Sequence, residues 1–138
     1  MTSNLDLETF LKATESWVDD LMQSLGWHDR QRTWLALLAT LHAVRDCLGR
    51  DEAVYVGAQL PPLLRGLYYE GWHPRTRGTS TRSAFLERIL EGMHRDVAID
   101  AEQIARAVLA VLARRISSAE LEDAKAATPA AIRNLWPD

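Results

Sequence analysis

The chain has 138 residues, the length of one domain, and its 47% hydrophobic and 25% charged residues are the ordinary balance of a soluble globular protein. A formal net charge of −3 gives no basic field that would attract nucleic acid or anionic lipid. No apolar run approaches the ~18 residues of a membrane span, and the N-terminus has neither the basic region nor the apolar core of a signal peptide. We therefore predict a cytoplasmic protein without nucleic-acid or membrane partners, and its one cysteine, Cys47, fits a reducing compartment.

Two long helices are predicted at the start of the chain. Apolar residues between positions 7 and 25 recur at i, i+3, i+4 and i+7, which is the stripe of an amphipathic helix, and Gly26 suits its left-handed end. A second apolar stripe runs from near Asp29 to Leu48, and Gly49 is expected to close that helix.

Two short helices are expected next. Asp51 is predicted to cap a third helix that runs through Ala58. Pro61 would interrupt any continuation, because proline lacks the backbone donor and clashes with the preceding turn. We therefore place Pro61 in the first turn of a short fourth helix.

The second half of the chain shows the same order of helices, with clearer start signals. These signals are Ser83 or a nearby hydroxyl, Asp100 with Gln103, the capping box of Ser117 with Glu120, and the N-cap Thr128 before Pro129. No segment alternates with a period of two for long enough to indicate a strand. The predicted fold class is all-α.

The two halves match when the sequence is shifted by 68 residues. Trp17–Leu21 then falls on Phe85–Ile89, and identical residues coincide at Ala39/Ala107, Leu41/Leu109, Glu52/Glu120, Ala58/Ala126, Pro61/Pro129, Arg65/Arg133 and Leu67/Leu135. We predict a single domain, 1–138, formed by one helical bundle of two pseudo-repeated halves. The repeat covers 9–72 and 83–138, each with two long helices followed by two short ones, and a crossover loop, 73–82, joins them.

One stretch of the first half resembles a known family signature. Residues 57–72 read GAQLPPLLRGLYYEGW, and a weaker second copy, AATPAAIRNLW, covers 126–136. This pattern, behind an Ala/Leu-rich helix, is similar to that of the bacterial family called domain of unknown function 2267 (DUF2267). The resemblance extends from about Trp17 to Trp136. It implies a helical fold and a bacterial origin, and it implies no activity, cofactor or site residues.

The segment 69–82 has almost no counterpart in the repeat, so function is sought there. One interpretation is a crossover loop with Trp72 folded back on the core. Another is a site for a small anion, in which Arg75, Arg77 and Arg82 join Arg65 on the preceding helix. The hydroxyl groups of 76–81 among arginines also resemble a phosphorylation site.

Catalysis and metal binding have weaker support. The four histidines lie on different predicted elements, so no metal or cofactor is predicted. Glu70 with His73 contains the groups of an acid/base site, which leaves a small enzyme as an alternative. Trp27 and Trp72 are less easily buried by periodicity and favour a protein partner or a homodimer.

The function favoured by the sequence is a non-catalytic interaction or ligand-binding module. Its predicted binding surface consists of Arg65, Tyr69, Trp72, Arg75 and Arg77.

Overall fold

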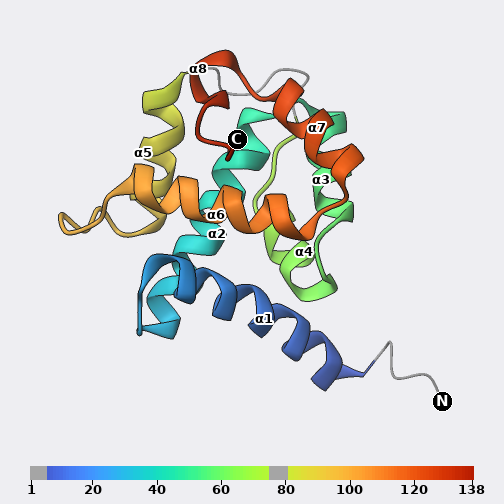
Figure 1. Cartoon of the computed structure of the whole chain (residues 1–138), viewed down its shortest axis with the longest axis vertical. Helices are drawn as coiled ribbons and strands as arrows, with labels where there is room; N and C mark the ends of the chain where they lie inside the picture. Colours follow the sequence, from blue (N-terminus) through green and yellow to red (C-terminus); the bar gives the residue numbers. More distant parts are fainter. Residues whose placement is uncertain (1–5, 75–80) are drawn as a thin grey trace.

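The computed structural model describes residues 6–74 and 81–138, and within these ranges it contains eight α-helices and no strand (Figure 1). The predicted all-α class is confirmed. The helices are α1 (Leu7–Leu25), α2 (Arg30–Cys47), α3 (Arg50–Ala58), α4 (Pro62–Tyr69), α5 (Arg82–Gly92), α6 (Ala101–Arg115), α7 (Ser118–Ala127) and α8 (Ala130–Arg133).

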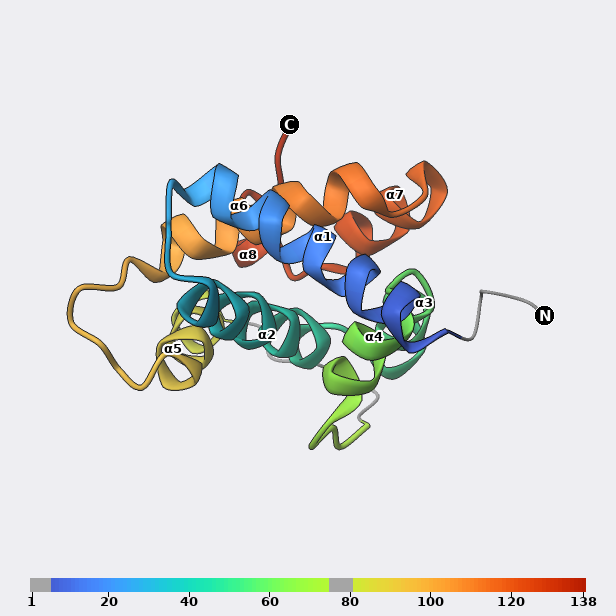
Figure 2. The same cartoon turned by 90° about the horizontal axis from the view of Figure 1, so that it is seen from below.

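The helix α2 lies at the centre of the bundle. It packs against α1, α3, α4, α5 and α6, and α1 and α6 lie together on one side of it (Figure 2). Leu37 and Leu41 of α2 are completely buried in one core cluster with Leu21, Ile89 and Ile104 from α1, α5 and α6. Burying each such side chain stabilises the fold by about 1.5–3 kcal/mol, so the four long helices form the main body of the bundle.

Several predicted helix ends are confirmed. Gly26 ends α1 in the left-handed conformation, with φ 70°. Asp29 caps α2, and Asp100 caps α6, each by accepting hydrogen bonds from backbone N–H groups in the first turn. Ser117 caps α7 in the same way. These caps satisfy donors that have no partner inside the helix, so the local sequence positions the helix starts.

The junction of α2 and α3 differs from prediction by a few residues, whereas the start of α5 agrees with the predicted cap by Ser83 or a nearby hydroxyl. Gly49, expected to close α2, is instead the N-cap of α3, and Leu48 in an extended conformation ends α2. Asp51 is therefore not a cap and lies in the first turn of α3, where its charge still complements the helix dipole. Thr81 opens α5 through its hydroxyl, two residues before Ser83.

The prolines that were expected in the first turn of α4 and of α8 lie instead one position before each helix. Pro61 is the N-cap of α4, whose first residue is Pro62, and Pro129 is the N-cap of α8. Thr128 was expected to cap α8 and does not. Its buried hydroxyl donates to the carbonyl oxygen of Ala124 at 2.6 Å, so it belongs to the end of α7.

Arg65 and Arg133, which are 68 positions apart, make matching contacts. Arg65 Nη2 donates to the carbonyl oxygens seven and five residues before it, at 3.4 and 2.8 Å. Arg133 Nη2 donates to the carbonyl oxygens at the same two offsets, at 3.3 and 2.8 Å. Each guanidinium group thus satisfies acceptors at the end of the short helix α3 or α7.

Two ion pairs are also related by the offset of 68 residues, but the acidic residue of one pair corresponds to the basic residue of the other. Asp46 on α2 pairs with Arg88 on α5 at 3.3 Å, and Asp20 on α1 pairs with Arg114 on α6 at 2.6 Å. Adding 68 to 20 and 46 gives 88 and 114, so aspartate in one pair corresponds to arginine in the other. Each pair bridges a first helix and a second helix from different halves of the chain.

Candidate functional site

A small polar pocket lies between the end of α2, the helix α5 and the segment after α4. Its volume is about 150 Å³, and its lining residues are Arg45, Asp46, Leu48, Gly71, Trp72, His73 and Arg88. A single water needs only about 10–15 Å³, so this pocket has room for a small molecule or for several waters.

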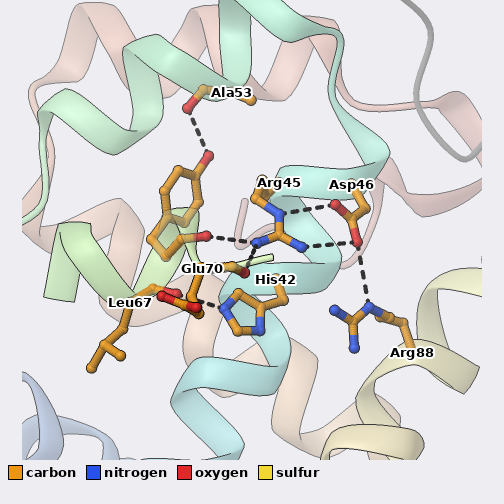
Figure 3. Close-up of polar contacts among 8 residues, drawn as sticks. His42, Arg45, Asp46, Ala53, Leu67, Glu70 and Arg88 are labelled. Atoms are coloured by element: carbon orange, nitrogen blue, oxygen red, sulfur yellow. Dashed lines mark hydrogen bonds and ion pairs between the residues drawn. The ribbon is translucent and has the colours of Figure 1, made fainter. Parts of the chain in front are cut away.

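Arg45 is the buried charge of the pocket. It lies in the last turn of α2, is 2% exposed, and its Nη1 donates to the carbonyl oxygens of Tyr68 and Glu70 at 2.8 and 2.9 Å (Figure 3). Its Nε and Nη2 donate to the two carboxylate oxygens of Asp46 at 2.9 and 3.3 Å. These contacts fix the guanidinium group and tie the end of α4 to α2.

Asp46 connects Arg45 to the opposite wall. Its Oδ2 also accepts a hydrogen bond from Arg88 Nε at 3.3 Å (Figure 3). The Arg88 side chain is 37% exposed, and within 6–74 and 81–138 its two terminal nitrogens have no hydrogen-bond partner. Two guanidinium groups and one carboxylate leave the pocket with a surplus of one positive charge.

An aromatic wall completes the pocket. Gly71, with φ 73°, lets the chain turn sharply after α4, and the backbone N–H of Trp72 donates to the carbonyl oxygen of Tyr69 at 3.0 Å. The half-buried Trp72 ring packs on the Tyr69 ring, with 5.4 Å between their centroids. Trp72 therefore offers an apolar surface directly beside the charged groups.

The predicted site residues lie in different places. Trp72 lines the pocket, and Tyr69 supports it while its hydroxyl donates to the carbonyl oxygen of Val54 at 3.4 Å. Arg65 is directed elsewhere, because its donors are taken by backbone carbonyls around the end of α3. Arg75 and Arg77 lie outside the described residues.

The residues of the enzyme alternative are both exposed. His73 lines the pocket, whereas Glu70 takes part in the site through its backbone carbonyl, which accepts from Arg45. Trp27, the other tryptophan expected at a surface, is half-buried and is covered by the guanidinium group of Arg32, 5.0 Å from its ring centroid.

Two titratable neighbours of the pocket are held neutral at pH 7. Burial, together with the nearby positive charges of Arg45 and Arg88, lowers the pKa of His42, although its Nε2–H donates to the carbonyl oxygen of Leu67 at 2.8 Å (Figure 3). Burial raises the pKa of Cys47 to about 12, which disfavours the thiolate that a nucleophile requires.

Arg45, Asp46 and Arg88 were missed by the sequence analysis. A signal for Arg45 was present, because it lies within the apolar stripe of α2, four residues after Leu41 and three before Leu48. A charged residue at such a position is rarely buried without partners, so the stripe itself indicated a buried ionic contact.

Two general features of the described residues bear on function. Histidine, cysteine, aspartate and glutamate side chains nowhere gather there in a group of three that could hold a metal ion. Within this part of the chain, no helix combines the length and the apolar character that crossing a membrane requires.

Comparison with known proteins gives one family and no curated relative. No curated protein matches the chain. Residues 14–135, most of the chain, match the family described as "Uncharacterized conserved protein (DUF2267)", in agreement with the resemblance noted for residues 57–72. The chain therefore belongs to the DUF2267 family.

Proposed function

We propose that this protein is a non-catalytic binding module that holds a small anion in the pocket between Arg45, Arg88 and Trp72. The observation that supports the proposal most strongly is the buried guanidinium group of Arg45 beside a hollow of about 150 Å³. A buried charge is costly to desolvate, and here its partners hold it rigidly at the wall of an open space. An anion in that space would gain from a group whose orientation is already fixed.

The ligand class follows from the chemistry of the lining. Guanidinium groups recognise carboxylate and phosphate oxygens through paired N–H donors. Asp46 neutralises one of the two arginines, so a ligand with one or two negative charges balances the pocket better than a polyanion. The Trp72 ring then favours a ligand whose anionic group is attached to an apolar or planar part.

Binding can be tested by following the indole N–H signal of Trp72 in nitrogen-15 NMR spectra. Inorganic phosphate, acetate and indole-3-acetate serve as probes, and the variant Trp72→Phe assigns the signal. We expect a saturable shift with at least one probe. Arg88→Gln should weaken binding at least about tenfold, because loss of a charged hydrogen bond costs about 1.5–3 kcal/mol.

The chain offers a matched control for Arg88. Arg114→Gln removes the corresponding ion pair with Asp20, and neither residue lines the pocket. This variant should bind the probe as the unmodified protein does. Equal weakening by both substitutions, or a lack of saturation with every probe, would contradict the proposal.

A protein partner is the second candidate, and the exposed face beside the pocket favours it. A groove of about 240 Å³ is lined by the charged residues Arg50 and Asp51 and by Val54, Tyr55, Trp72 and Pro74. Val54 and Tyr55 are 43% and 58% exposed. A partner could cover this apolar face and the pocket together, because Trp72 lines both. Sedimentation velocity would detect self-association, which Tyr55→Lys should abolish if the partner is a second copy.

Internal duplication forms part of the proposal. The matching contacts of Arg65 and Arg133 support it, as do the exchanged ion pairs of α1–α6 and α2–α5. The pocket lies between the two halves, at the Asp46–Arg88 pair, and the corresponding Asp20–Arg114 pair marks where a second copy of it would lie. We further infer a bacterial, cytoplasmic protein, in keeping with a single cysteine that is buried.

A further inference from the structure

The interface between α3 and α7 contains two facing carboxyl groups. Glu52 of α3 and Glu120 of α7 are related by the offset of 68 residues, and the Glu52 side chain lies within hydrogen-bonding reach of Glu120. Glu120 is 9% exposed. The Oε2 atoms of both residues are buried and have no hydrogen-bond partner in the described part of the chain.

Glu120 is available for this contact because its capping box is half formed. Ser117 Oγ accepts a hydrogen bond from the Glu120 backbone N–H at 3.2 Å, as the box requires. The reciprocal bond, from the Ser117 backbone N–H to the Glu120 carboxylate, is absent, since this N–H donates instead to Oε1 of Gln59 at 3.0 Å. The Glu120 carboxyl group is thereby left to face α3.

The charged surroundings of the pair are acidic. Besides Glu52, the charged group that acts on Glu120 is Asp123, from its own helix. The helix α4 presents Tyr68 to α3, and its hydroxyl donates to the carbonyl oxygen of Ala53. The helix α2 contributes Arg45, whose guanidinium group contacts Asp46 and the carbonyls at the end of α4 and not the glutamate pair.

Two buried carboxyl groups side by side cannot both ionise without large repulsion. If one of them is protonated, it can donate a hydrogen bond to the other, and neither group is then left without a partner. Burial first, and then the hydrogen bond and charge of Glu52, raise the pKa of Glu120 to about 8. The helix dipole opposes this effect, because Glu120 lies in the first turn of α7, but its contribution is only about 0.3–1 kcal/mol.

We propose that Glu52 and Glu120 share one proton across the interface of the two halves and that loss of this proton to the solvent loosens α7 from α3. In the protonated state, the carboxyl O–H of one glutamate donates to the carboxylate of the other. In the deprotonated state, two negative charges repel each other at the contact between the short helices. The pair thus acts as a pH-sensitive switch, referred to below as the lock: it holds α7 against α3 at neutral and acidic pH and releases it at alkaline pH.

The proton can be observed directly in the unmodified protein. Carbon-13 NMR of the glutamate side-chain carboxyl groups gives one titration curve for each residue, and Glu52→Gln and Glu120→Gln assign the pair. We expect one of the two to titrate with a midpoint near 8. Midpoints near the ordinary value of 4.5 for both would overturn the proposal.

Opening of the lock can be followed by thermal unfolding and amide hydrogen exchange. At pH 9, Glu120→Gln should raise Tm by at least about 4 °C over the unmodified protein and slow exchange in α7 relative to α6. The matched control is Glu122→Gln, an exposed glutamate on the same helix, which should change neither quantity. A Tm and exchange pattern identical in Glu120→Gln and the control would also overturn the proposal.

Discussion

Several arginines of this protein use their guanidinium groups to complete helix ends. Arg45 donates to the carbonyls of Tyr68 and Glu70 at the end of α4, and Arg65 and Arg133 do the same near the ends of α3 and α7. The last carbonyls of a helix have no partner within it, so a donor from a neighbouring segment replaces water there. Lysine could not reproduce these contacts, because it lacks the planar set of five donors.

Gly57 provides a test of packing at the scale of one residue. A methyl group at this position would overlap with the Tyr69 hydroxyl group, whereas one at Gly66, also in a helix, would meet no atom within 4 Å. We therefore expect Gly57→Ala to destabilise the fold by about 1–3 kcal/mol through overpacking.

Gly66→Ala serves as the matched control, and it should stabilise the fold by about 0.4–1 kcal/mol by reducing the freedom of the unfolded chain. Urea unfolding measures both changes. The combination of Gly57→Ala with Tyr69→Leu should recover part of the loss. Equal effects of the two glycine substitutions would show that the Tyr69 contact does not limit the packing of α3 against α4.

At the scale of the helices, periodicity and caps predicted the elements well because these signals are local. Asp29 and Asp100 cap helices through their own first turns. Thr128 failed as a predicted cap since its hydroxyl bonds within the preceding helix and accepts from Trp136. The local sequence is the same whether a threonine before a proline caps the following helix or bonds to the preceding one. Tertiary packing decides which of the two contacts forms.

Thr128 links the end of α7 to the C-terminal segment through one oxygen atom. Its Oγ1 donates to Ala124 at the end of α7 and accepts from Nε1 of Trp136 at 2.9 Å, both in the buried interior. Thr128→Val keeps the shape but leaves the indole N–H without its acceptor. We expect a loss of about 1–3 kcal/mol in the free energy of unfolding.

The control for Thr128→Val is Thr9→Val, on the exposed surface of α1, which should change stability by less than about 0.5 kcal/mol. Denaturant unfolding followed by circular dichroism measures both. If the loss of stability in Thr128→Val comes from the contact with Trp136, then Thr128→Val should cause no further loss in a protein that already carries Trp136→Phe. Persistence of the full loss in that background would assign it to the end of α7 instead.

At the scale of the whole molecule, the pocket could not be predicted because its parts come from distant segments. Arg45 contacts carbonyls 23 and 25 residues later, and Asp46 meets Arg88 42 residues later. Of the predicted binding surface, Trp72 lines the pocket, and Arg65 is engaged at the end of α3. The 57–72 motif thus located the region, while the charged groups could be identified only through tertiary packing.

Stability of the whole molecule should depend on pH through two groups with opposite signs. The pKa of His42 is lowered by burial, so below its ordinary value of 6.5 the unfolded chain binds a proton that the folded chain does not, and stability rises with pH up to 6.5. The pKa of Glu120 is raised from 4.5 to about 8, so between these values the folded chain holds the extra proton and stability falls with rising pH.

Just below pH 6.5, the contributions of His42 and Glu120 to the pH dependence of stability have opposite signs. Above pH 6.5, only the contribution of Glu120 remains. Between pH 4.5 and about 8, we expect the free energy of unfolding to fall with rising pH above 6.5 and to depend less steeply on pH just below 6.5. In Glu120→Gln it should rise to pH 6.5 and then stay level. In His42→Gln, which keeps a donor for Leu67, it should fall throughout the range, by at most about 1.4 kcal/mol per pH unit. Urea unfolding at each pH measures all three profiles, and parallel profiles would exclude both groups as the source of the pH dependence.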